Sequence, residues 1–191
     1  MASISDNLKN FISVDIEAAG PIPSQYALLS MGACTLTHPR GTFYVELIPD
    51  QDRTDPHSMS VHGLDLEMLK RQGLPPKEAL QKLAGWLANA IPGGEKPVMV
   101  AFNAPFDWMF IHDYFIRYLG ENPFGHSAVD IKAVYMGASG KSWQETSGAH
   151  LHKRYHHGKT LSHNALEDAI DQAEIFEGIL REIINPGRSL D

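Results

Sequence analysis

The sequence of 191 residues has little cysteine, few basic residues and no long hydrophobic run, and each absence excludes a class of protein. The one cysteine, Cys34, cannot form an intrachain disulfide, so a disulfide-stabilised scaffold is excluded and a small buried side chain is expected there. No apolar run approaches the roughly 20 residues that a membrane-spanning helix needs. The first residues, MASISDNLKN, lack the basic and apolar stretches of a secretory signal, which indicates a cytoplasmic protein with no membrane partner.

Basic residues are outnumbered by acidic ones, with 16 Lys and Arg against 23 Asp and Glu, and the net charge is −7 at pH 7. A surface of this kind does not coat nucleic acid non-specifically through positive charge. The negative net charge is still compatible with a nucleic-acid enzyme. Carboxylates that bind divalent cations count as negative in the net charge, although the site with its ions bound can be neutral or positive. Composition alone therefore leaves the substrate open.

The hydrophobic pattern predicts an α/β domain. Three β-like segments come first, the second and third joined by a hairpin turn, and strand–helix alternation follows. This order indicates a mixed sheet with helices on both faces. We expect a single domain over residues 1–184 and a flexible tail at 185–191. The predicted strands cover 11–17, 26–37, 41–48, 97–102 and 127–130, and the predicted helices cover 75–90, 103–119, a segment from 131 and 166–184; the loop at 49–63 is expected to hold short helical turns, and 137–162 to be irregular.

Two acids interrupt the first predicted strand, in the segment FISVDIEAAG. Residues two apart on a strand face the same side, so Asp15 and Glu17 project together while Val14 and Ile16 face the other way. Two ionised carboxylates so placed repel each other, and burial raises the cost. A cation between them removes this penalty, and oxygen ligands favour Mg²⁺ or Mn²⁺. The alternative is an edge strand whose acids face solvent.

Two further acids lie where a shared site would need them. Asp107 follows an apolar strand in the first turns of a helix, near the strand end where ligand sites of open α/β sheets gather. Asp168 lies in the opening turns of the last helix. Each acid also admits a simpler interpretation, in which a carboxylate in the first helical turn interacts favourably with the helix dipole.

The spacing of His163 and Asp168 carries more information. On a continuous helix, five residues would leave the two side chains about 140° apart, so they converge only if His163 lies outside the helix. Asn164 and Glu167 have the spacing of a helix N-cap and its third residue, which predicts that the helix begins just after His163. A solvent-exposed histidine is the alternative.

Taken in order, the motifs DIE, NAPFD and HNALED resemble the three motifs of the DnaQ-like 3′–5′ exonucleases, in the branch with a histidine (DEDDh). The resemblance runs from about Phe11 to Leu180. It implies an RNase H-like fold, with a five-stranded mixed sheet whose first three strands are antiparallel. It also implies release of nucleoside 5′-monophosphates from the 3′ end of single-stranded or short RNA or DNA, with two Mg²⁺ or Mn²⁺ ions. Some relatives with this fold form homodimers, so a homodimer is a further hypothesis.

By motif position, the resemblance makes Asp15, Glu17, Asp107 and Asp168 the metal ligands and His163 the general base. Two ions can stabilise both the attacking and the leaving oxygen of a phosphoryl displacement. A histidine can accept the water's proton near neutral pH. All five residues are therefore predicted to be catalytic.

Candidate substrate contacts are five: Ala18, Tyr26, Asn103, Phe106 and Lys159. Ala18 stands where many family members have threonine, and Tyr26 could stack on the terminal nucleotide or simply begin the second strand. Lys159 belongs to the segment GAHLHKRYHHGKT, which either presents positive charge to phosphates or is a solvated loop. The histidines of this segment do not have a familiar zinc spacing.

Structural roles are expected for Asp130, for the three tryptophans and, besides its candidate substrate contact, for Asn103. Asp130 ends a short strand and is expected to hydrogen-bond nearby strand ends. Asn103 is expected to cap the helix that follows it. The three tryptophans, Trp86, Trp108 and Trp143, are predicted to be core or half-buried packing residues rather than platforms for nucleobases.

Two other functions compete with the exonuclease. A metal phosphodiesterase for dinucleotides or cyclic nucleotides would need only a more closed pocket around the same acids. A non-catalytic module that binds nucleic-acid ends is the other alternative, but a binder has no need for a crowded carboxylate cluster. The sequence does not distinguish RNA from DNA.

Overall fold

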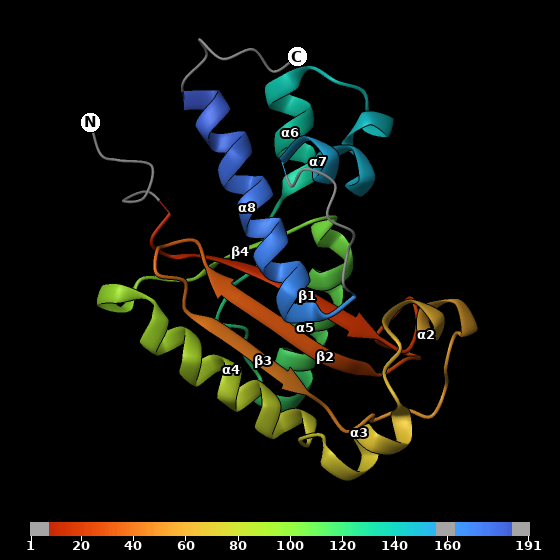
Figure 1. Ribbon diagram of the computed structural model, residues 1–191. Coiled ribbons are helices and arrows are strands. Elements are labelled where there is room, and N and C mark those ends of the chain that lie inside the picture. Colours follow the sequence, from red (N-terminus) through yellow and green to blue (C-terminus); the bar gives the residue numbers. More distant parts are fainter. Residues whose placement is uncertain (1–7, 156–162, 185–191) are drawn as a thin grey trace.

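The computed structural model describes residues 8–155 and 163–184, which form a five-stranded sheet with helices on both faces (Figure 1). The strand order is β3-β2-β1-β4-β5. β1 pairs antiparallel with β2 and β2 with β3, whereas β4 lies parallel to β1 and β5 parallel to β4. The expected mixed sheet, with its first three strands antiparallel, is confirmed. The strands are β1 (Phe11–Ala18), β2 (Leu28–Thr35), β3 (Thr42–Glu46), β4 (Val98–Ala101) and β5 (Ala128–Asp130).

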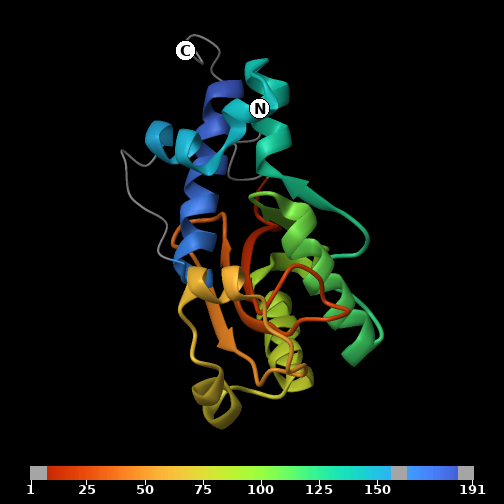
Figure 2. The ribbon, with the colours of Figure 1, turned by 90° about the vertical axis from the view of Figure 1, so that its right-hand side faces the viewer.

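Side chains of β1 alternate between the two faces of the sheet, and each face is covered by its own layer of helices. Ile12, Val14 and Ile16 face a core completed by α4 (Pro76–Ala90) and α5 (Ala104–Leu119). The other face of the sheet packs against α6 (Ile131–Ser139), α7 (Gly148–Tyr155) and α8 (Ala165–Ile184). Figure 2 shows α8 and α5 on opposite sides of the sheet. Asp15 and Glu17 therefore point toward the layer that contains α8.

The first turn of α8 rests directly on β2, and a glycine makes this approach possible. A Cβ atom at Gly32 would lie 2.2 Å from the backbone carbonyl of Ala165, far inside van der Waals contact. Gly32 is paired with Asp15 across the β1–β2 ladder. The start of α8 is thus held beside Asp15 at a position where only glycine fits.

Two connecting regions contain more helix than expected. The polar loop at 49–63 does contain a short helix, α2 (Pro56–His62), as predicted, but α3 (Leu66–Gln72) follows it unpredicted. The stretch from Gly137 to Ser162, expected to be irregular, contains a 3₁₀ helix η2 (Trp143–Thr146) and α7; another 3₁₀ turn, η1 (Pro92–Gly94), ends the α4 region. That expectation was wrong for residues 137–155, and residues 156–162 lie outside the described residues. Short helices give a weak apolar pattern because they bury few side chains: α3 buries only Leu69, and α7 only Leu151 and His152.

The start of α5 is capped differently from the prediction. Asn103 adopts a left-handed conformation (φ 62°) and makes no side-chain cap hydrogen bond. The Ala104 N–H instead donates to Asp130 Oδ2 at 2.7 Å, while Oδ1 of the same carboxylate accepts from the Ala133 N–H at 2.7 Å. Asp130 therefore joins the beginnings of α5 and α6, a structural role as expected but at helix starts rather than strand ends.

No described helix is long and apolar enough to cross a membrane. The tail predicted at 185–191 lies outside the described residues. The single-domain boundary at 184 and the homodimer stay predictions.

Candidate active site

A pocket of about 220 Å³ opens where β1 meets the starts of α5 and α8. Four predicted acids and the predicted base line it together, although they come from three distant parts of the chain. The complete lining is Asp15, Ile16, Glu17, Phe102, Phe106, Asp107, Gly148, His152, His163, Asp168 and Gln172.

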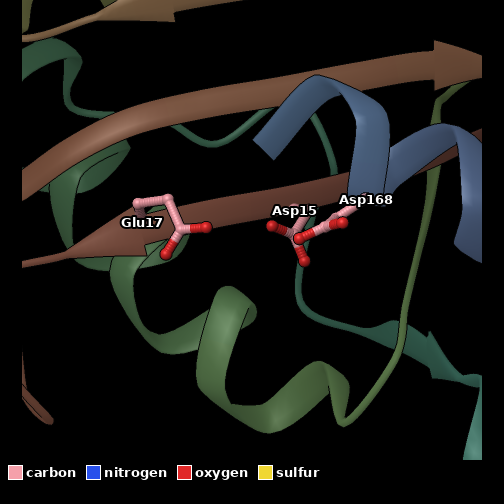
Figure 3. A group of neighbouring side chains, drawn as sticks. All are labelled: Asp15, Glu17 and Asp168. Carbon is pink, nitrogen blue, oxygen red and sulfur yellow. The ribbon is translucent and has the colours of Figure 1, made fainter. Parts of the chain in front are cut away.

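Three carboxylates form the centre of the pocket. Asp15 and Glu17 project from β1, and Asp168 reaches them from the first turn of α8 (Figure 3). One oxygen of each carboxylate lies within 4.8 Å of the others, which is close enough for one ion to contact all three. Within the described ranges, this is the only cluster of three or more His, Cys, Asp or Glu side chains with such spacing.

The fourth acid, Asp107, lies beside this cluster without belonging to it. Its side chain is 3% exposed and accepts a hydrogen bond from the Ile16 N–H at 3.1 Å. This bond ties the first turn of α5 to the middle of β1, between the two strand acids. Asp107 thus faces the same pocket from the opposite layer of helices.

The electrostatics of the pocket favour a cation. Burial, followed by the charges of Asp107, Glu17 and Asp168, raises the pKa of Asp15 well above its ordinary value. Burial raises the pKa of Asp107 in the same way, and burial together with Asp168 raises the pKa of Glu17 from 4.5 to about 8. Carboxylates this close resist ionisation together unless positive charge is added. The oxygen-only donor set suits Mg²⁺ or Mn²⁺, so these residues fit the expected ions.

Gln172 holds Asp15 in place and was not foreseen from the sequence. Its Nε2 donates to Asp15 Oδ1, and its Oε1 accepts from the Phe102 N–H at 2.8 Å. The side chain therefore links α8 to both β1 and the end of β4. The signal available in the sequence was its position four residues after Asp168, one helical turn further along the same face.

His163 lies just outside α8, as predicted. Asn164 Oδ1 accepts from the N–H groups of Leu166 and Glu167 at 3.1 and 3.3 Å, which fixes the helix start after the histidine. His163 itself has a left-handed backbone (φ 54°) and is exposed at the pocket. The cap thus separates the histidine from the helix and allows it to share the pocket with Asp168.

The predicted substrate-contact residues differ in whether they line the pocket. Phe106 lines the pocket, whereas Ala18, Tyr26 and Asn103 do not. Tyr26 is 8% exposed and packs against Gly20, where a Cβ would lie 2.3 Å from the tyrosine ring. Ala18 is buried at the end of β1, Asn103 is exposed, and Lys159 lies outside the described residues.

Of the described histidines in the segment GAHLHKRYHHGKT, only His152 lines the pocket. His152 is 6% exposed on α7, while His150 is exposed on the same helix. His156 and His157 lie outside the described residues. His152 is the lining residue whose position was least expected, because the segment was predicted to be irregular.

Comparison with known proteins agrees with this geometry. Residues 12–176 match the model of a family described as exonuclease. The 3′-5′ DNA exonuclease Cap18 of Escherichia coli is 43% identical over 166 residues, which cover 87% of this chain and 89% of the relative. The chain belongs to the DnaQ-like family of 3′–5′ exonucleases. It is therefore a hydrolase that acts on phosphodiester bonds.

Solved structures confirm the RNase H-like fold. The nuclease domain of 3′hExo, described as a DEDDh family member bound to rAMP, superposes with a TM-score of 0.73 at 15% identity, covering 90% of this chain and 92% of that one. A 3′-exonuclease that recognises the 3′ end of a histone mRNA stem-loop gives 0.71 at 13% identity, with 90% and 81% covered. At these identities the likeness concerns the fold alone.

The raised carboxylate pKa values predict a pH-dependent response to Mg²⁺. Because the folded pKa of Glu17 is about 8 and its ordinary value is 4.5, the metal-free protein should lose stability as pH rises between these values. Mg²⁺ that binds only the folded, ionised site should restore it. Thermal melts in chelator and in Mg²⁺ at pH 5, 6.5 and 8 should show a Tm difference that grows with pH. Glu17→Gln should flatten this trend, and a pH-independent difference in the wild type would contradict the prediction.

Proposed function

We propose that the protein removes nucleoside 5′-monophosphates one at a time from the 3′ end of single-stranded DNA. The observation that carries this proposal is the pocket itself, in which Asp15, Glu17 and Asp168 lie within ligand distance of one another and His163 borders the same space. DNA is chosen over RNA because the relative with 43% identity is named as a DNA exonuclease.

The four acids are proposed to hold two Mg²⁺ or Mn²⁺ ions. Asp15, Glu17 and Asp168 have the spacing of a shared ligand set, and Asp107 adds a fourth carboxylate at the pocket wall. When bound, the ions supply Lewis-acid stabilisation of the charge that develops on the scissile phosphate. Gln172 keeps Asp15 oriented through its hydrogen bond, and Phe106 offers an apolar wall to the terminal nucleotide.

His163 is proposed to accept the proton of the attacking water. The water oxygen then bonds to phosphorus, and the bond between phosphorus and the 3′ oxygen of the preceding nucleotide breaks. That oxygen takes a proton from solvent water and becomes the new 3′ hydroxyl. A histidine suits this role because it gains and loses a proton near neutral pH. Its position before the N-cap of α8 leaves it exposed at the pocket, where a proton can pass to solvent.

A 5′-labelled oligonucleotide assay tests the function. We expect a DNA strand to shorten one nucleotide at a time in Mg²⁺ or Mn²⁺, to remain intact in chelator, and to release nucleoside 5′-monophosphates. An RNA strand of the same sequence should shorten more slowly. Cleavage confined to dinucleotides would favour the phosphodiesterase alternative, and binding without product would favour the end-binding module.

Removal of the His163 side chain is predicted to slow phosphodiester hydrolysis without weakening metal binding. His163→Ala should lower the rate on the order of 10²–10⁴-fold, because the attacking water loses its proton acceptor. Thermal stabilisation by Mn²⁺ should be unchanged, since no carboxylate is removed. His150→Ala is the matched control, because this exposed histidine on α7 lies outside the pocket lining. A rate that stays at the wild-type value between pH 6 and 8 would remove His163 from the mechanism.

A further inference from the structure

Trp143 differs from the other tryptophans in being exposed. The sequence predicted a packing role for all three, but Trp143 keeps 47% of its surface open to solvent at the start of η2. Trp86 packs against Phe43 and Trp108 stacks on His112. The packing prediction was therefore wrong for Trp143, because η2 is a single short turn that buries only Thr146.

A lysine lies over the exposed indole. The Lys132 ammonium is 4.1 Å from the centroid of the Trp143 ring and 5.9 Å from that of Phe102. Such contacts with an aromatic face stabilise a cation modestly and hold its side chain in one direction. Among the described residues, Lys132 forms no ion pair with a carboxylate, so its charge is available to an anion.

Phe102 connects Lys132 and Trp143 to the catalytic pocket. Phe102 lines the pocket, and so does Gly148, whose Cβ position would lie 3.7 Å from the Phe102 ring. The Lys132 ammonium lies between the rings of Phe102 and Trp143 in contact range of both, on the same layer of helices as Asp168. Behind Phe102, this side of the acidic pocket thus carries one cation and one solvent-exposed aromatic ring.

We propose that Lys132 and Trp143 form a strand platform that binds the nucleotide next to the scissile phosphate, on its 5′ side. The indole stacks on an unpaired base, and the ammonium contacts a backbone phosphate. This inference rests on the proposed function, because it names where the rest of the substrate strand lies. Stacking requires an unpaired base, so the platform favours single strands over duplexes. It also supplies local positive charge in a protein whose net charge is −7.

Binding and cleavage are measured separately to test the platform. Fluorescence anisotropy with a labelled single-stranded DNA hexamer in chelator measures binding without turnover. Trp143→Ala should raise the Kd on the order of 5- to 150-fold, the range for loss of one stacked base. Lys132→Gln should lower the salt slope of log Kd by about 0.7, as expected for one lost phosphate contact on a single strand. Hydrolysis of the p-nitrophenyl ester of thymidine 5′-monophosphate, which has no preceding nucleotide, should be unchanged in both variants.

Two controls separate stacking and local charge from general effects. Trp143→Phe keeps an aromatic ring and should retain most of the binding. Lys82→Gln removes an exposed charge on α4, in the other layer of helices, and should leave the Kd unchanged. The platform is refuted if Trp143→Ala binds the hexamer like the wild type, or if it loses ester hydrolysis in the same proportion as hexamer binding. Failure of the wild type to cleave the ester and the hexamer would instead refute the proposed function, and the anisotropy comparison would still decide the platform.

Discussion

Asp15→Asn is expected to abolish nucleotide release while making the metal-free protein more stable. The carboxylate lies at the centre of the site, with Asp107, Glu17 and Asp168 all acting to raise its pKa. Loss of one charge removes a ligand from the proposed ions and, in chelator, relieves the repulsion among the acids that remain. The Gln172 hydrogen bond can persist, because Oδ1 of an asparagine still accepts from Nε2.

Two measurements check this prediction. In chelator at pH 8, the Tm of Asp15→Asn should exceed that of the wild type by about 2–4 °C for each kcal/mol of relieved repulsion. In Mn²⁺ the order should reverse, because only the wild type gains stability from the ions. Asp113→Asn is a suitable control, since this acid lies on α5 in an exposed ion pair with Arg117 and outside the pocket. Wild-type nucleotide release by Asp15→Asn would remove the acid cluster from the mechanism.

The parts of the site that sequence reasoning located depend on short-range rules. Asp15 and Glu17 share a face because strand side chains alternate, and the structure places both in the pocket. His163 was separated from α8 by the capping signal of Asn164, whose side chain does accept from the first turn of the helix. Each rule needs only a few neighbouring residues, so each could be applied without knowing the fold.

The parts that were missed depend on tertiary contacts. Asn103 was expected to cap α5, but Asp130, 26 residues after Ala104, accepts the Ala104 N–H instead. Gln172 could be placed on the face of Asp168 but not in contact with Asp15, which is 157 residues away. The helices at 137–155 bury too few side chains to show a clear apolar period. No local pattern specifies these partners, because they depend on how distant elements meet.

Gly32→Ala is expected to reduce activity strongly although Gly32 does not line the pocket and its backbone is not left-handed. An added Cβ would lie 2.2 Å from the carbonyl carbon and oxygen of Ala165, both backbone atoms. The start of α8 must therefore move by more than about 1 Å to restore van der Waals contact. This movement carries Asp168 away from Asp15 and Glu17, and a misplacement of about 1 Å can cost on the order of 10²-fold in rate.

Stability and metal binding should change together with the rate. Overpacking of this kind costs about 1–3 kcal/mol, so Gly32→Ala should melt earlier than the wild type yet remain folded at 25 °C. Mn²⁺ should stabilise it less, because the three carboxylates no longer converge. Gly85→Ala is the matched control: this exposed position on α4 has nothing within 4 Å of the new Cβ, and alanine there should add up to about 1 kcal/mol of stability with full activity. If Gly32→Ala is folded and as active as Gly85→Ala, then the close contact between β2 and the start of α8 does not position Asp168.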